Sequence, residues 1–418
     1  MPRRDSGNPQ TMLGKRRSGK SDKSLTSDVS RSAQWYPGDV AAAGFIAIGS
    51  GPAGLSAAET FRSKHPGIPV RILTGDPALP YAKPPLSKGF LCDREDKRDL
   101  HSAGWFDHHK IELIRGITVD RIDTDDQEVI TAGGQRYPYW HLVIASGATP
   151  VKPDIPGAST ALSLRSFADA VALKMAARYA ESAVVIGAGL IGCEAAACLA
   201  ARGVETALVA AEAVPVQRRF GPEAGERVLK ILSDNGVGFV GETTVTEIRD
   251  TGVVFDDGTE VKADLVVLAT GVRPDIRLAE SAGLETSDGR IVVDEHMRAS
   301  ARNVYAAGDV ALAHNVTARR RIRSEHWRDA AVQGLVAGLA AAGIDAAWDQ
   351  IPGFSCTIGD SVLKYRGWGG YDTCRLVDHH GGFTVWHEAD GDVVGVLTLN
   401  TDADLLRVDE LLRANPVA

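Results

Sequence analysis

Glycines recur at two places along the chain with a spacing that suits phosphate binding. The first motif is Gly49-Ser50-Gly51-Pro52-Ala53-Gly54 and the second is Gly187-Ala188-Gly189-Leu190-Ile191-Gly192. In such a motif the first glycine permits a tight turn, the second lets the backbone approach a pyrophosphate, and the third lets a helix pack closely on a strand. The N-terminus of that helix then offers amide groups and partial positive charge to the phosphate. The spacing indicates dinucleotide binding, although a single motif of this kind is often an ordinary turn.

Each glycine motif is preceded by an apolar run and followed by a helical pattern and a second apolar run. The runs are 44–48 and 70–73 in the first unit, and 183–186 and 206–209 in the second. Short apolar runs of this kind are typical of buried parallel strands. Two complete strand-turn-helix-strand units argue against chance, and they predict an α/β fold with two Rossmann-like dinucleotide-binding domains.

A hairpin signal and a returning apolar strand follow each unit. The hairpin turns are predicted at 132–134 and 256–258, where glycines stand between short β-branched runs. The returning strands end in similar sequences, Ala145-Ser146-Gly147 and Ala269-Thr270-Gly271. We expect Ser146, Gly147 and Gly271 to lie beside the two dinucleotides.

The composition excludes several classes of function. The chain has 418 residues, a formal net charge of -8 and 44% hydrophobic residues. The negative charge argues against nucleic acid and anionic membranes as partners, and no apolar run reaches the roughly 18 residues of a membrane span. The five cysteines are few, odd in number and scattered, which favours a reducing, cytoplasmic setting. No metal site is expected, and the protein could be a monomer or a homodimer.

Residues 1–40 differ from the rest of the chain. They are basic and rich in serine, with little apolar periodicity, so we expect a disordered tail. A targeting peptide is an alternative. The segment from Gly14 to Ser21 matches the phosphate-loop pattern, but it has no strand before it, so we interpret the match as accidental.

The segment Leu79-Pro80-Tyr81-Ala82-Lys83-Pro84-Pro85-Leu86-Ser87-Lys88 is the most distinctive in the sequence. Together with the two glycine motifs, it resembles the FAD-dependent pyridine nucleotide-disulfide oxidoreductase superfamily, in the branch of ferredoxin, rubredoxin and putidaredoxin reductases and apoptosis-inducing factor. The resemblance covers about residues 41–418. It implies FAD as a bound cofactor and NADH or NADPH as the electron donor.

The resemblance also implies a domain order. An FAD-binding domain is expected over 41–152 and 277–345, an NAD(P)-binding domain over 153–276, and a C-terminal α+β interface domain over 346–418.

Particular site residues follow from the resemblance. Residues that match Lys83 and Lys88 contact the FAD in relatives, and Lys88 with Glu194 would form the catalytic pair beside the flavin N5. A lysine there stabilises the anionic reduced flavin, and a paired carboxylate restrains it. The alternative for Glu194 is an acid that only stabilises a helix N-terminus. Asp76 is expected at the adenosine ribose, although relatives often carry the acid at the position of Gly75.

Two later segments complete the expected flavin site. Asn303 to Asp309 resembles the second FAD fingerprint, so Gly308 and Asp309 are predicted to bind the cofactor. Glu325, His326 and Trp327 resemble the segment whose aromatic residue closes over the flavin, with a buried core tryptophan as the alternative. Ser355 stands where relatives carry tryptophan, which departs from the family pattern.

The cysteines decide between branches of the superfamily. No cysteine lies between Gly54 and Tyr81, where disulfide reductases of the superfamily carry one. Cys193 and Cys198 lie about 140° apart around their helix, so we expect small core residues and no disulfide relay. Electrons would therefore pass from FAD to an iron-sulfur ferredoxin or a rubredoxin-like acceptor that serves an oxygenase or cytochrome P450. The alternatives are a flavin oxidase or peroxidase, a quinone reductase, and a binding protein like apoptosis-inducing factor.

Two further hypotheses concern selectivity. Ala210 replaces the acid expected at the end of the second strand of the NAD(P) unit. Glu212 could substitute for that acid and favour NADH, whereas Arg218 and Arg219 could bind a 2'-phosphate. Five arginines, Arg319, Arg320, Arg321, Arg323 and Arg328, cluster within ten positions of an acidic chain and could steer an acidic ferredoxin or be ordinary solvated surface.

Overall fold

The computed structural model describes residues 43–414, which belong to one compact unit that begins at Ala42. The predicted basic tail, with its phosphate-loop-like segment, lies outside the described residues.

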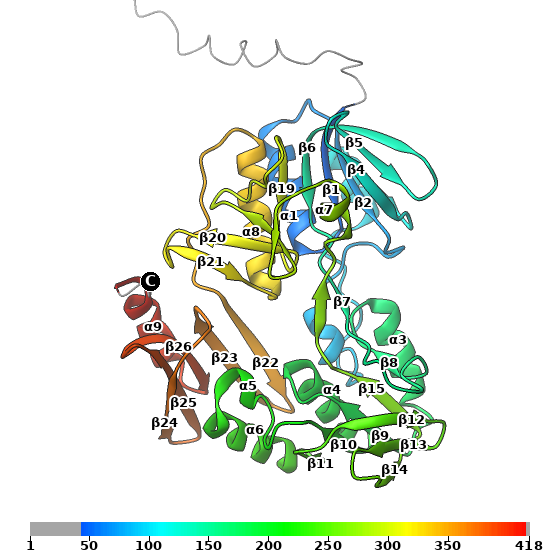
Figure 1. The fold of residues 1–418 in the computed structure, drawn as a ribbon, viewed down its shortest axis with the longest axis vertical. Coiled ribbons are helices and arrows are strands. Elements are labelled where there is room, and N and C mark those ends of the chain that lie inside the picture. The colour runs from blue at the N-terminus through cyan, green and yellow to red at the C-terminus, as the bar shows by residue number, and fades with distance from the viewer. Residues whose placement is uncertain (1–42, 415–418) are drawn as a thin grey trace, which may run out of the picture. The chain divides into compact units, whose positions relative to one another are not determined.

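The first dinucleotide-binding domain is built on a parallel sheet with the strand order β3-β2-β1-β6-β19 (Figure 1). The strand β1 is buried along its whole length, as expected for a strand covered on both faces. Helices α1 and α8 pack against each other beside this sheet, and a Cβ on Gly334 of α8 would lie only 2.1 Å from the Ala53 carbonyl oxygen of α1. The first part of β6 also pairs with the hairpin strands β5 and β4. The elements before the domain crossover are β1 (Gly44–Ile48), α1 (Pro52–Lys64), β2 (Val70–Thr74), η2 (Pro84–Ser87), α2 (Ala103–His109), β3 (Ile111–Arg115), β4 (Val119–Asp123), β5 (Glu128–Thr131), β6 (Arg136–Ile144) and β7 (Ala148–Pro150).

The chain returns to this domain after residue 274. The small sheet β17-β18-β20-β21 is formed on both sides of the returning strand β19 in the chain order, because β17 and β18 precede β19, whereas β20 and β21 lie between β19 and the helix α8. The elements are α7 (Arg277–Ser281), β17 (Thr286–Ser287), β18 (Arg290–Val293), β19 (Val304–Ala306), β20 (Ala311–Asn315), β21 (Arg320–Arg323) and α8 (Trp327–Ala341).

The second dinucleotide-binding domain repeats the plan of the first. Its parallel sheet has the order β11-β10-β9-β15-β8, and the antiparallel strands β12, β13 and β14 take the place of the β4–β5 hairpin. The predicted duplication is therefore confirmed. The elements are β8 (Leu162–Ser163), α3 (Phe167–Ala176), β9 (Ser182–Ile186), α4 (Leu190–Ala201), β10 (Glu205–Val209), α5 (Gln217–Phe220), α6 (Pro222–Asp234), β11 (Val237–Val240), β12 (Val245–Arg249), β13 (Gly252–Phe255), β14 (Glu260–Lys262), β15 (Leu265–Leu268) and β16 (Val272–Pro274).

The two connections between these domains run side by side. β7 carries the chain out of the first domain and β16 brings it back, and the two strands pair antiparallel from Ala148 with Pro274 to Pro150 with Val272. The predicted domain boundaries at 152/153 and 276/277 lie just beyond this ribbon, and we retain them as a proposal.

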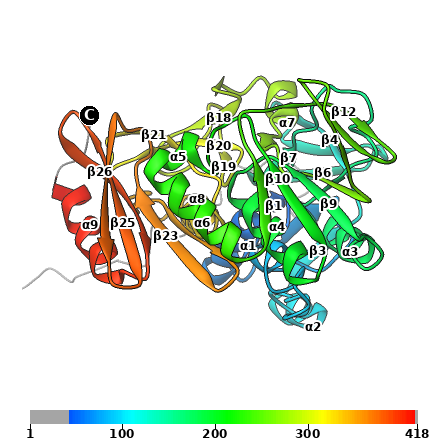
Figure 2. The same cartoon turned by 90° about the horizontal axis from the view of Figure 1, so that it is seen from below.

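The C-terminal domain is a five-stranded antiparallel sheet in the order β22-β23-β26-β25-β24 (Figure 2). Val408 and Leu412 of α9 are fully buried, and they belong to the same apolar cluster as Trp386 and Val396 of this sheet. The strand β22 contacts both α4 and α8, so it meets both dinucleotide-binding domains. The elements are β22 (Gly353–Ile358), β23 (Ser361–Gly367), β24 (Thr373–His379), β25 (Gly382–Ala389), β26 (Asp392–Leu399) and α9 (Asp402–Ala414).

Within residues 43–414, none of the helices combines the length and the apolar character that crossing a bilayer would require.

Candidate active site

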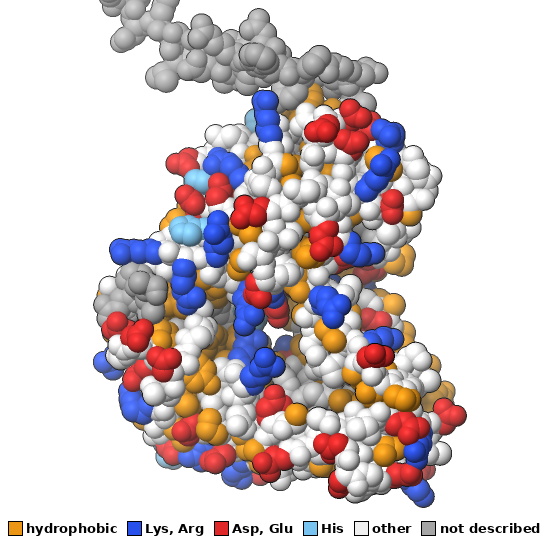
Figure 3. Space-filling model, viewed as in Figure 1, with side chains coloured by type: hydrophobic (Ala, Val, Ile, Leu, Met, Phe, Trp, Pro, Cys, Tyr) orange, Lys and Arg blue, Asp and Glu red, His pale blue; other side chains and the backbone are white. Residues whose placement is uncertain are grey.

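A cavity of about 870 Å³ connects the two glycine motifs. Figure 3 shows a hollow at the middle of the molecule, with lysine and arginine side chains gathered beside it. Nearly all residues that the sequence assigned to cofactor binding or catalysis line this cavity, and they come from both dinucleotide-binding domains. They are Gly49, Gly51, Pro52, Ala53, Asp76, Lys83, Lys88, Ser146, Gly147, Gly187, Gly189, Leu190, Ile191, Glu194, Gly271, Gly308, Asp309, Glu325, His326 and Trp327.

The two exceptions, Gly54 and Gly192, pack a helix onto a strand. A Cβ on Gly54 would lie 1.9 Å from the Gly49 carbonyl oxygen, and Gly192 has the same relation to Gly187. Gly49 itself has φ +106°, a conformation that favours glycine. By contrast, a Cβ on Gly51 or Gly189 would meet nothing within 4 Å, because both residues face the open cavity. The first and third glycines therefore have the turn and packing geometry that the motif predicts, and the second leaves open space on the cavity side.

The helices α1 and α4 both begin at the wall of the cavity. Their N-cap residues are Gly51 and Gly189, and neither helix has a side chain that caps its first amide groups. Free amide groups at a helix N-terminus can bind a phosphate, and the macrodipole adds partial positive charge. Each domain therefore has a site that suits a dinucleotide pyrophosphate.

Charged side chains gather at the end of the cavity that belongs to the FAD-binding domain. Arg165 donates from Nη2 to Asp309 Oδ2 at 2.7 Å and from Nε to the Ala148 carbonyl oxygen at 3.0 Å. Burial, with repulsion from Arg165 as a smaller cause, lowers the pKa of Lys83 to about 8. A buried ammonium group beside a guanidinium group suits an anionic ligand. The charges present therefore fit the phosphates of FAD.

Asp76 is held in place before any ligand binds. Its Oδ1 accepts a hydrogen bond from the Ala78 amide at 2.9 Å, and its Oδ2 accepts one from the Tyr81 hydroxyl at 2.8 Å. Tyr81 in turn accepts a hydrogen bond from the Phe167 amide at 2.8 Å, which fixes its ring between the two domains. A carboxylate has further lone pairs, so Asp76 can still accept from a ribose hydroxyl.

Lys88 and Glu194 form an ion pair in the cavity wall, with Lys88 Nζ 2.9 Å from Glu194 Oε1. Glu194 is only 2% exposed. It also accepts hydrogen bonds from the Ser87 hydroxyl at 2.5 Å and from the Thr357 amide at 3.0 Å. The carboxylate thus joins η2 of the first domain, α4 of the second and β22 of the third. Its partners show that it does more than stabilise a helix N-terminus.

An aromatic group closes the cavity on the side of β22. The rings of His326 and Phe354 stack with their centroids 4.6 Å apart, and the Arg219 guanidinium lies 4.9 Å from the Phe354 centroid. Trp327 is half-buried and lines the cavity, so the alternative of a buried core tryptophan is wrong. Ser355 is exposed to the cavity at the position where the family pattern has tryptophan.

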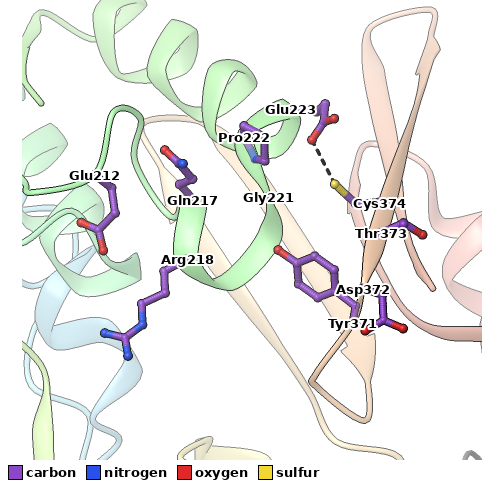
Figure 4. A pocket seen from close by; sticks show the side chains of 10 residues that line it. All are labelled: Glu212, Gln217, Arg218, Gly221, Pro222, Glu223, Tyr371, Asp372, Thr373 and Cys374. Atoms are coloured by element: carbon purple, nitrogen blue, oxygen red, sulfur yellow. Dashed lines mark hydrogen bonds between the residues drawn. The ribbon is translucent and has the colours of Figure 1, made fainter. Parts of the chain in front are cut away.

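A smaller cavity of about 610 Å³ adjoins this site between α5, α6 and the start of β24 (Figure 4). Glu212, Gln217 and Arg218 line both cavities. On its other side, Cys374 donates a hydrogen bond to Glu223 Oε2 at 2.9 Å.

The cysteine prediction is confirmed for one residue and wrong for another. Cys193 is a buried free thiol, but Cys198 forms a disulfide with Cys92. The prediction rested on the spacing of Cys193 and Cys198 around a single helix. The actual partner of Cys198 is Cys92, which lies in another domain, 106 residues away. Neither half of the disulfide lines the main cavity, and Cys356 is the one cysteine among its described lining residues. Burial raises the pKa of the Cys356 thiol, which argues against a reactive thiolate.

Sequence reasoning missed Arg165, Tyr81, Ser87 and Thr357. Arg165 precedes Ser166, which caps α3, and nothing in that local signal points to a cofactor. Thr357 acts through its backbone amide, so its residue type carries no signal. Among residues 43–414, no three or more His, Cys, Asp or Glu side chains gather in a way that could hold a metal ion.

Comparison with known proteins identifies the family. Residues 45–334 match the pyridine nucleotide-disulphide oxidoreductase model. The chain belongs to this family. It is 31% identical over 384 residues to the ferredoxin–NAD(+) reductase component of the anthranilate 1,2-dioxygenase system of Burkholderia cepacia, which covers 88% of this chain and 94% of that protein.

Solved structures agree with this assignment. The ferredoxin reductase for the CYP199A2 system of Rhodopseudomonas palustris has 29% identity and a TM-score of 0.84 over 90% of this chain and 95% of that one. The covalent putidaredoxin reductase–putidaredoxin complex has 27% identity and a TM-score of 0.84, over 88% of this chain and 93% of that one. The fold of two dinucleotide-binding domains and a C-terminal domain is therefore confirmed, and the chain is an oxidoreductase that uses FAD and a nicotinamide dinucleotide.

Proposed function

We propose that this enzyme takes a hydride from NADH or NADPH and passes the electrons to a ferredoxin- or rubredoxin-type protein, which serves an oxygenase or cytochrome P450. The observation that carries the proposal is the Lys88–Glu194 pair in a cavity wall to which no cysteine pair contributes. Without a disulfide in that wall, electrons have no protein relay and must leave at the cofactor itself. Relatives named as ferredoxin reductases over nearly the whole chain support the proposal.

The role of FAD, when bound, is to accept a hydride and to release single electrons. The protein supplies the electrostatics. The Lys88 ammonium group stabilises negative charge that develops beside it, and the buried Glu194 carboxylate holds that ammonium group in one position. Ser87 and the Thr357 amide satisfy the other lone pairs of Glu194, so its orientation is fixed before the donor arrives. Ile191, which is 46% exposed at the start of α4, offers an apolar surface to the incoming nicotinamide.

The individual roles of the predicted site residues are part of the proposal. The motif at Gly49 with Lys83, Arg165 and Asp309 would hold FAD, and the motif at Gly187 would hold the nicotinamide dinucleotide. We also propose a cytoplasmic enzyme that acts as a monomer or homodimer, which size-exclusion chromatography with light scattering can test.

The experiment that tests the function uses the purified holoenzyme. NADH is added anaerobically until the flavin is reduced, and the reduced enzyme is mixed with a [2Fe-2S] ferredoxin, a rubredoxin, oxygen or a soluble quinone in a stopped-flow instrument. We expect one of the iron-sulfur proteins to reoxidise the flavin faster than oxygen or quinone does. Faster reoxidation by oxygen or quinone would show a flavin oxidase or quinone reductase instead.

A further inference from the structure

The helix α4 and its C-cap residue Arg202 are joined to one short segment of the FAD-binding domain at three successive turns. Glu194, Cys198 and Arg202 follow one another at intervals of four residues, so their side chains lie on the same face of the helix. Each of them contacts the segment 87–93, which begins at the last residue of the Pro-rich turn η2. We call this set of contacts the α4 clamp.

The first contact of the α4 clamp is the catalytic one. Glu194 binds Lys88 Nζ at 2.9 Å and the Ser87 hydroxyl at 2.5 Å. The third contact lies two turns further along α4, where Arg202 donates to the Leu91 carbonyl oxygen at 3.0 Å and to the Asp93 carboxylate. Lys174 of α3 pairs with the same carboxylate at 2.6 Å.

The middle contact is covalent, because Cys198 forms a disulfide with Cys92. The Cys92 amide donates to the Lys88 carbonyl oxygen at 2.9 Å, and Cys198 Sγ lies 3.3 Å from the same oxygen. The backbone of Lys88 is therefore in contact with both halves of the disulfide. Cys92 stands one turn after Lys88, as Cys198 stands one turn after Glu194, so the covalent bond runs beside the ion pair.

The disulfide is placed for exchange with an outside thiol and not with the cofactor. Neither cysteine lines the main cavity, so the bond lies outside the wall that faces the flavin. Cys92 is partly exposed, whereas Cys198 is only 5% exposed. Because Cys92 is the more exposed half of the disulfide, an incoming thiolate would attack the Cys92 sulfur and displace Cys198 as the leaving thiolate.

We propose that the Cys92–Cys198 disulfide is a thiol-exchange site that positions Lys88, so that reduction by a dithiol slows the transfer of hydride to the enzyme. The dithiol attacks Cys92 to form a mixed disulfide, and Cys198 leaves with the electron pair of the broken bond and takes up a proton. The second thiol of the reductant then closes its own disulfide and releases Cys92 as a thiol. Two electrons and two protons pass from the dithiol to the protein, and the covalent bond in the α4 clamp is replaced by a thiol that can donate to the Lys88 carbonyl oxygen.

The first test measures thiols and local motion without the donor. Titration under denaturing conditions should find three free thiols in the untreated protein and five after treatment with dithiothreitol. Hydrogen exchange of residues 84–93 should rise on treatment, in the apoprotein as in the holoenzyme. Five free thiols in untreated protein purified without reductant and exposed to air, or unchanged exchange after treatment, would overturn the proposal.

The second test measures hydride transfer by stopped flow, which needs no acceptor protein and therefore separates this inference from the proposed function. Treated wild type, Cys92→Ser and Cys198→Ser should each reduce their flavin more slowly than untreated wild type, by about tenfold or more, since a misplacement of about 1 Å can cost about a hundredfold in rate. Cys374→Ser is the matched control, because it removes a free thiol in the smaller cavity (Figure 4) and should leave the rate unchanged. Equal rates in all forms would overturn the proposal, and the treated wild type keeps the test valid if a variant fails to fold.

Two further measurements distinguish positioning from other roles. The midpoint potential of the flavin should fall in the treated protein, because Lys88 no longer stabilises the reduced state in full, whereas a purely structural bond would leave it unchanged. Anaerobic titration of the untreated enzyme should need one equivalent of NADH per flavin. A second equivalent consumed by the disulfide would show a redox relay and would overturn the positioning role.

Discussion

Arg219 donates a hydrogen bond from its guanidinium group to Nε2 of His326, 2.8 Å away, across the boundary between the two dinucleotide-binding domains. The histidine accepts because it is neutral. His326 is half-buried, whereas Arg219 is exposed on the cavity side. Burial, with repulsion from Arg219 as a smaller cause, lowers the pKa of His326 to about 3. The same guanidinium group lies over Phe354 of the C-terminal domain, so one arginine joins all three domains.

Replacing either partner should loosen this wall of the cavity. We expect Arg219→Met and His326→Leu each to raise the KM for NADH by about tenfold, the value of a hydrogen bond to a charged group. The double variant should lose no more than the worse single variant, because the two residues act as one contact. Steady-state rates with ferricyanide provide the measurement, and additive losses would show that the two residues act separately.

The low pKa of His326 also predicts how the stability of the folded protein depends on pH. The folded state keeps this histidine neutral to about pH 3, whereas an unfolded chain protonates it near pH 6.5. Its contribution to stability is therefore complete above about pH 6.5 and is lost as the pH falls below that value. Denaturant midpoints measured at pH 7.5 and 5 should accordingly differ less in His326→Leu than in wild type.

The affinity for FAD should fall as the pH rises through about 8. The pKa of Lys83 is lowered to about 8 in the ligand-free protein, and a bound phosphate would raise it, so binding takes up a proton above that pH. Fluorescence titration of the apoprotein with FAD between pH 6.5 and 9.5 measures the effect. Lys83→Met should bind FAD more weakly and lose the pH dependence, whereas Lys152→Met, at an exposed position, should behave as wild type. A slope that persists in Lys83→Met would assign the titration to another group.

NADH should be the preferred donor. Arg219 is occupied by His326 and Phe354, which leaves Arg218 beside Glu212 at the junction of the two cavities. A carboxylate at this position accepts the ribose hydroxyls of NADH and repels the 2'-phosphate of NADPH. In Glu212→Ala, kcat/KM for NADH should fall and that for NADPH should rise, each by about tenfold for one interaction of this kind. Glu205→Ala is the control, and a wild-type preference for NADPH would refute the assignment.

The arginine cluster should guide an acidic acceptor. Arg319 and Arg321 are exposed on the β20–β21 hairpin, whereas Arg320 reaches towards the carbonyl oxygens of Trp368 and Gly369 and is best left intact. Arg319→Glu/Arg321→Glu should slow reduction of a ferredoxin about tenfold at low ionic strength and weaken its dependence on salt, since steering acts on the encounter rate.

Two controls separate docking from damage to the cofactor site. Ferricyanide reduction by the same variant should stay nearly unchanged, and Arg121→Glu/Arg178→Glu, at exposed positions elsewhere, should reduce ferredoxin as wild type does. Equal loss with ferredoxin and ferricyanide would indicate a damaged cofactor site.

The sequence predicted the parts of the fold whose signals are local. The apolar runs at 44–48 and 183–186 became β1 and β9 to within one residue, because a strand buried on both faces must be apolar along its length. The glycine motifs were equally readable, since their geometry depends on residues close together in the chain. The resemblance placed Lys88 and Glu194 correctly in one cavity wall.

The remaining parts depend on contacts between domains. Nothing near Cys92 in the sequence points to Cys198, and the pairing follows only when η2 and α4 are brought together. The bond between Arg219 and His326 has the same origin, since the two residues are 107 positions apart. The ion pair of Arg165 with Asp309 spans 144 positions, and the residues around neither of them in the sequence indicate the pairing.

The β7–β16 ribbon makes the nucleotide-donor domain an insert that enters and leaves its host through one two-stranded stalk. Neighbouring strands lie about 4.8 Å apart, so the two points where the chain leaves and re-enters the FAD-binding domain are as close together as the ends of a hairpin loop. Such a topology permits module exchange, in which a donor domain of another selectivity is grafted at the stalk, provided that the graft keeps the side chains that meet the flavin-binding domain, Glu194 and Arg219 among them. The graft must carry a cysteine at the position of Cys198, because the host's Cys92 would otherwise be left without its partner.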